Sequence, residues 1–92
     1  MNAEEVRTYL AELNPEALLA DGFDRALVGV AGRCGMAAVA VYDRDKCIEV
    51  LADQGMDWPE AEEYFCFNVE GAYLGEGTPL FATFSSDFVL AD

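Results

Sequence analysis

The 92-residue chain contains no histidine, so it lacks the commonest general base, the usual partner of a nucleophilic serine or cysteine, and a frequent zinc ligand. Its three cysteines, Cys34, Cys47 and Cys66, form no C-x-x-C pair and cannot all pair within one chain. Buried, reduced thiols are the plainer interpretation, and a reactive Cys66 or an intermolecular disulfide is the alternative. We therefore expect a protein that is not an enzyme and that holds no cofactor and no metal.

Other candidate sites for chemistry have simpler structural explanations. Asp43 and Asp45 beside Lys46 could form a metal or base site, but a helix start explains them better. Residues 75–77 (GEG) lack the lysine and the strand-to-helix setting of a phosphate loop, so they predict a turn. Carboxylates that could hold magnesium are plentiful, but no feature of the sequence selects a particular set.

Long apolar runs are also missing. The longest uncharged stretches, residues 34–42 and 77–86, fall well short of the ~18 residues that span a bilayer. Glu4 and Glu5 stand where a secretory signal would have basic residues. We expect a soluble, cytoplasmic protein without a membrane partner.

Positive charge is scarce and unevenly placed. The chain has eighteen acidic residues and five basic ones, for a net charge of −13. Residues 1–46 carry eight acidic and five basic residues, whereas residues 47–92 carry ten acidic residues and no basic one. Such a surface would be repelled by nucleic-acid phosphates and by anionic lipids, and it favours a partner with a basic surface. An acidic domain whose charge serves only solubility is the alternative.

Apolar residues, in contrast, are abundant. They make up 53% of the chain and include six Phe, four Tyr and one Trp. This content is enough for a packed core, and it excludes the composition of a disordered chain. The length predicts one compact domain over residues 1–92, with a short flexible tail at about 86–92.

Helix signals occur at four places. Asn2 and Glu5 have the spacing of a capping box, and they precede an apolar stripe formed by Val6, Leu10 and Leu13. Asn14-Pro15 predicts a second, short helix that ends at residues 21–22. A third helix is predicted to start at Asp43, to turn Cys47, Ile48 and Leu51 inward, and to end at Gln54-Gly55. A fourth is predicted to start at Asp57, because Glu60 repeats the capping-box spacing and Pro59 stands in the first turn.

Strand signals occur in between. The charge-poor runs 26–33 and 36–42, separated by Cys34-Gly35, predict an antiparallel hairpin, although Gly29 and Gly32 weaken the first run and leave a helix open there. A last strand is predicted over residues 80–84. The expected fold class is α+β: a single domain in which a three-stranded antiparallel sheet packs against about four helical segments.

The helix that begins after Asp57 carries aromatic residues that cannot all face one core. A rotation of ~100° per residue gathers Trp58, Ala61, Phe65, Val69 and Ala72 on one side. It places Phe67 on the opposite side among glutamates. Phe67 could belong to a second packing layer under the final strand or under Phe88, or it could be an aromatic anchor ringed by acids, as in protein-binding patches. The candidate partner-binding residues are Asp57, Glu60, Glu63, Tyr64, Phe67, Glu70 and Glu76.

At residues 67–81, in the pattern F-N-x-x-G-A-x-x-G-x-x-T-P-x-F, the chain resembles small, acidic, uncharacterised proteins encoded by bacteriophages and prophages. The likeness includes residues 43–51 (DRDKCIEVL) and the turn 55–57 (GMD), and it spans roughly residues 18 to 81. What the resemblance implies is a context. Small early phage proteins often disable host defences, and anti-CRISPR proteins are the best-known class of this size and acidity.

Two functions are therefore expected from the sequence. The first is a stoichiometric inhibitor in the cytoplasm of a bacterial host, which occupies a basic nucleic-acid-binding surface of a host protein or ribonucleoprotein complex by mimicking phosphate charge or by steric occlusion. The second is a phage accessory module, structural or regulatory, whose acidity serves solubility. The chain would be a monomer or a homodimer, and in neither case would it bind nucleic acid directly.

Overall fold

The computed structural model describes residues 2–72 and 74–84, so the predicted tail at 86–92, with Phe88, lies outside the described residues. The elements follow in this order: helix α1 (Ala3–Leu13), a 3-10 turn η1 (Asp24–Ala26), strands β1 (Leu27–Arg33) and β2 (Met36–Asp43), helices α2 (Arg44–Asp53) and α3 (Trp58–Phe65), a π turn η2 (Cys66–Glu70) and strand β3 (Leu80–Ala82).

Helix α1 begins as the sequence predicts. The Asn2 side chain accepts a hydrogen bond from the Glu5 backbone N–H at 2.9 Å, and the Glu5 carboxylate accepts one from the Asn2 N–H at 3.2 Å. Val6 and Leu10 are buried in the core, but Leu13 is 51% exposed. The prediction for Leu13 was wrong because it is the last residue of the helix, where the apolar stripe no longer meets the core.

The short helix predicted from Asn14 does not form. The Asn14 side chain instead donates to the Ala38 carbonyl at 2.8 Å. The following segment uses its backbone donors on distant partners: the Leu18 N–H binds the Gly77 carbonyl at 3.0 Å, and the Ala20 N–H binds the Tyr42 hydroxyl at 2.8 Å. These long-range bonds replace the i→i−4 bonds that a helix would make.

Strands β1 and β2 form the predicted antiparallel hairpin, with Val30 opposite Ala40. The hairpin turns at residues 34–35, where Gly35 has a φ of +80°, a conformation that favours glycine. Strand β3 corrects the prediction, because it pairs with β2 in parallel, with Leu80 opposite Val41. It also ends at Ala82 rather than at residue 84.

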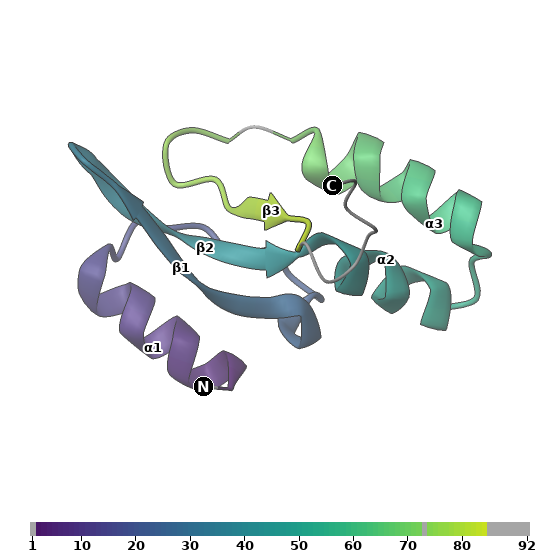
Figure 1. The fold of residues 1–92 in the computed structure, drawn as a ribbon, viewed down its shortest axis with the longest axis horizontal. Coiled ribbons are helices and arrows are strands. Elements are labelled where there is room, and N and C mark those ends of the chain that lie inside the picture. The colour runs from purple at the N-terminus through teal and green to yellow at the C-terminus, as the bar shows by residue number, and fades with distance from the viewer. Residues whose placement is uncertain (1, 73, 85–92) are drawn as a thin grey trace, which may run out of the picture.

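The path of the chain explains the parallel pairing. After β2, the chain continues directly into α2, and α3 returns alongside α2 (Figure 1). The loop after α3 then runs back along the sheet, so β3 enters in the same direction as β2 (Figure 1). Helix α1 lies along the hairpin, whereas α2 and α3 lie together beyond the end of β2 (Figure 1). The described residues thus form an α+β domain with three α-helices and a mixed sheet of order β1-β2-β3, in place of four helical segments and an antiparallel sheet.

Contacts between aromatic rings connect helix α3 to the sheet within the core. The Phe81 ring of β3 stacks on Tyr42 at 5.6 Å between centroids and meets Phe65 edge-on at 5.1 Å. Phe23 also meets Phe65 edge-on, with 6.2 Å between ring centroids. Because Phe65 lies on α3 and Tyr42 on β2, Phe81 ties the helix pair to the sheet. Phe65 and Tyr42 are both fully buried.

Candidate interaction surface

Helix α3 is positioned by the cap that the sequence predicts. The Asp57 carboxylate accepts a hydrogen bond from the Glu60 N–H at 2.9 Å, and Pro59 occupies the first turn. Ala61 and Phe65 are fully buried, which confirms the centre of the predicted core face. The prediction was wrong at the two ends of this face. Trp58, at the start of the helix, is 43% exposed, and Ala72 lies beyond the regular helix and is exposed. Val69 is half-buried.

A π turn replaces the last α-helical turn after Phe65. The Gly71 N–H donates to the Cys66 carbonyl at 3.0 Å, five residues back instead of four. A Cβ atom at position 71 would lie 2.8 Å from the same carbonyl oxygen, so the turn needs glycine there. Single π turns of this kind are rare and often lie at functional sites. A π turn takes more residues than an α-helical turn, so a regular-helix rotation becomes less accurate from Cys66 to Glu70.

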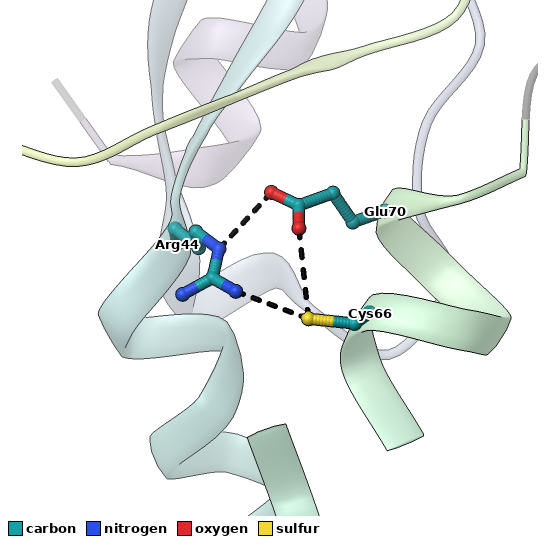
Figure 2. A network of polar contacts seen from close by, with 3 residues as sticks. All are labelled: Arg44, Cys66 and Glu70. Atoms are coloured by element: carbon teal, nitrogen blue, oxygen red, sulfur yellow. Dashed lines mark hydrogen bonds and ion pairs between the residues drawn. The ribbon is translucent and has the colours of Figure 1, made fainter. Parts of the chain in front are cut away.

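The consequence is clearest at Glu70. The regular-helix rotation places Glu70 beside Glu60, Glu63 and Phe67, but its carboxylate pairs with Arg44 of α2, with 3.0 Å between Nε and Oε2 (Figure 2). Sγ of Cys66 completes the cluster, at 3.2 Å from an Arg44 Nη2 atom and 3.8 Å from the second oxygen of Glu70. The hydrogen bond with Glu70 raises the pKa of Arg44 above its ordinary value. Glu70 thus joins α3 to α2.

The side of α3 that faces away from Phe65 carries a shallow recess. Phe67, which is 77% exposed, lines it together with Tyr64, which lies one turn earlier and is 45% exposed. The lining residues, which we call the α3 recess, are Pro59, Glu60, Glu63, Tyr64, Phe67 and Asn68. The Asn68 amide donates to the Tyr64 carbonyl at 3.1 Å, which holds the end of the recess in place.

Four of the seven predicted partner-binding residues therefore line one surface: Glu60, Glu63, Tyr64 and Phe67. Asp57 is occupied as the helix cap. Glu76 lies elsewhere, in a mainly apolar groove between the hairpin and the loop before β3. Pro59 and Asn68 also line the recess but were not predicted, although each stands four positions from a predicted residue and so shares its helix face.

The cysteines differ in environment. Cys47 is fully buried in α2, and burial raises the pKa of its thiol to about 12. The expectation of buried thiols holds for Cys47 but was wrong for Cys34, which is exposed at the hairpin turn. Cys66 is half-buried in the cluster with Arg44.

The expected helix cap at Asp43 forms, with the Lys46 N–H donating to its carboxylate at 3.3 Å.

Within residues 2–72 and 74–84, no three Cys, Asp or Glu side chains lie where they could share a metal ion. No helix in this described part of the chain has the length and apolar character needed to cross a membrane.

Comparison with known proteins adds no assignment: no family model matches the chain, and neither a curated protein nor a solved structure matches it. The likeness to phage-encoded proteins therefore remains an expectation.

Proposed function

We propose that the chain is a stoichiometric binding protein that uses the α3 recess to occupy a basic, nucleic-acid-binding surface of a host protein or ribonucleoprotein complex. The exposure of Phe67 carries the proposal: a phenylalanine that is 77% exposed, next to Glu60 and Glu63, has the composition of an anchor with a charged rim. A large apolar side chain that is this exposed contributes little to the core. Contact with a partner would bury it and so remove its apolar surface from water.

Charge supports the same role. The net charge of −13, with no basic residue after Lys46, provides long-range attraction toward a basic surface and repulsion from phosphate. Binding to such a surface would exclude the nucleic acid that normally lies there. The phage context and inhibition of the anti-CRISPR type come from the sequence resemblance, which also motivates the proposed location in the cytoplasm of a bacterial host.

The test combines capture with competition. The tagged protein is used to retain complexes from a bacterial lysate, the retained proteins are identified by mass spectrometry, and each purified candidate is titrated in a nucleic-acid gel shift. We expect one equivalent of the protein to abolish nucleic-acid binding and Phe67→Ala to lose this effect. Tyr9→Ala is the matched control, since Tyr9 is 47% exposed on α1. Full inhibition by Phe67→Ala, or capture without competition, would contradict the proposal.

A second candidate is the accessory module that forms homodimers. The observation that favours it is the groove between the hairpin and the loop before β3, which is lined mainly by apolar residues, among them Ala31, Val39, Pro79 and Leu80. Contacts of this kind are insensitive to salt, in contrast to a charge-steered interaction. Light scattering at low and high salt distinguishes the two: a salt-resistant dimer favours the module, and a monomer favours the inhibitor.

A further inference from the structure

The protein already holds one arginine on an aromatic ring. The guanidinium carbon of Arg44 lies 5.6 Å from the centre of the Phe65 ring, and its Nε donates to Glu70 at 3.0 Å. The ring face provides a favourable electrostatic contact and the carboxylate provides a charged acceptor. In this arrangement on the core side of α3, an aromatic ring and a carboxylate together hold a guanidinium group.

The opposite side of the helix presents the same two kinds of group without a guanidinium. Phe67 and Tyr64 provide two exposed rings, and Glu60 and Glu63 provide two carboxylates within one recess. All six lining residues belong to the described part of the chain, and none of them is basic. Three arginines of the chain pair elsewhere, with aspartate or glutamate partners: Arg7 with Asp24, Arg25 with Asp53 and Arg44 with Glu70.

We infer that the α3 recess binds an arginine side chain on the partner's basic surface, with the guanidinium over the ring of Phe67 or Tyr64 and its N–H groups toward Glu60 and Glu63. The inference rests on the proposed function and names the group that the site recognises. Arginine fits better than lysine because its guanidinium is planar, stacks on rings, is weakly hydrated and donates in a fork that matches a carboxylate. The ammonium group of lysine is compact and strongly hydrated.

The probes are two synthetic peptides of the same length and net charge, one with arginine and one with lysine at every basic position. Each is titrated into the ¹⁵N-labelled full chain, and amide shifts are followed by NMR at low salt. We expect the arginine peptide to shift residues 59–68 and to bind about two- to five-fold more tightly than the lysine peptide, the effect of one exposed cation–π contact. Equal affinities for the two peptides would overturn the inference.

Substitutions in the recess test which side chains cause the preference for arginine over lysine. Phe67→Leu keeps an apolar side chain but removes the ring, so it should reduce the preference for arginine while the lysine peptide binds as before. Glu60→Gln combined with Glu63→Gln should weaken both peptides. All these side chains are exposed, and unchanged thermal melts will verify that the variants fold.

The chain also offers an internal control. A second acidic recess lies on α1, where Tyr9 adjoins glutamates that include Glu4 and Glu12. Tyr9 is the one ring among the residues that line this recess, and it is 47% exposed, so the recess lacks the second ring and the 77% exposed phenylalanine of the α3 recess. General attraction between an acidic protein and basic peptides would shift both recesses equally, and that result would contradict recognition that depends on Phe67.

The two proposals can fail separately. A captured complex whose inhibition depends on Phe67, combined with equal peptide affinities, would leave the binding function standing and remove the arginine assignment. A clear preference for the arginine peptide at α3, with no competition against nucleic acid in the gel shift, would leave the recognition standing and remove the inhibitory function.

Discussion

Phe65 and Phe67 stand two residues apart in the chain, and truncation of each should have opposite effects. Phe65 is fully buried, meets Phe23 and Phe81 edge-on, and lies under Arg44. Phe65→Ala removes a large core side chain, which typically costs about 3–5 kcal/mol of unfolding free energy. For a domain of this size, this corresponds to a fall in Tm of more than about 12 °C. A large part of the ~5–15 kcal/mol that stabilises a typical domain would be lost.

Phe67→Ala should leave stability nearly unchanged. With 77% of Phe67 exposed, the substitution removes little buried surface, and changes at such sites usually stay within about 0.5 kcal/mol. If Phe67 is a binding hot spot, the same variant should instead lose on the order of 2 kcal/mol of binding free energy, mainly through a faster off-rate.

Urea denaturation of the two variants, beside a binding assay, separates these effects. The alternative, in which Phe67 packs under a further layer that includes Phe88, predicts a loss of about 3–5 kcal/mol for Phe67→Ala as well. A Phe67→Ala protein that unfolds at much lower urea than the unmodified chain would therefore refute the assignment of Phe67 to the surface and, with it, the anchor role.

The remaining predictions address charge, backbone and thiols. Reversing Glu60 and Glu63 to lysine should slow association and flatten its salt dependence in stopped-flow measurements, because rim charges act mainly on the on-rate; unchanged kinetics would argue against the acidic rim. Gly71→Ala should cost about 1–3 kcal/mol in urea melts, since its Cβ meets the Cys66 carbonyl at 2.8 Å, while Gly29→Ala, with open space around it, serves as the control. The Cys47 thiol should resist iodoacetamide at pH 8 in the folded protein. Stability should fall as the pH rises from about 9 toward 12, because the unfolded thiol ionises first. A gel shift at micromolar protein should detect no direct binding to DNA or RNA, and a shifted band in physiological salt would contradict the charge argument.

The parts of the fold that depend on local chemistry could be predicted from the sequence. The caps at Asn2, Asp43 and Asp57 satisfy nearby backbone donors, so short spacings reveal them. The hairpin likewise follows from two charge-poor runs and a glycine turn. The direction of β3 could not be predicted, because it depends on where the loop after α3 returns to the sheet. The segment after Asn14 had the signals of a helix, but distant partners such as Gly77 and Tyr42 take its backbone donors.

In the candidate site, too, one part could be predicted from the sequence and another could not. The exposure of Phe67 follows from its angular distance from Phe65, since residues two positions apart face nearly opposite sides of a helix. The position of Glu70 did not follow, because the π turn after Phe65 breaks the regular rotation and Arg44 lies 26 positions away in the chain. A regular-helix wheel therefore still predicts Phe67, near the start of the π turn, but no longer predicts Glu70 at its end.

The π turn has a further consequence for the charge around the α3 recess. In a regular helix, three glutamates would surround Phe67, but Glu70 is turned toward Arg44 and its charge is compensated there. The field at the α3 recess then comes chiefly from Glu60 and Glu63, the two carboxylates that line it. Glu70 and Arg44 serve the surface indirectly, because their ion pair joins the end of α3 to α2 and so helps to hold the rigid helix on which Phe67 is presented. Replacing Glu70 with glutamine should therefore lower stability by about 1 kcal/mol or less, as for a partly exposed ion pair, and should leave the on-rate nearly unchanged. A Glu70→Gln variant that folds normally but associates as slowly as the Glu60 and Glu63 reversal would show that the acidic rim extends past the π turn.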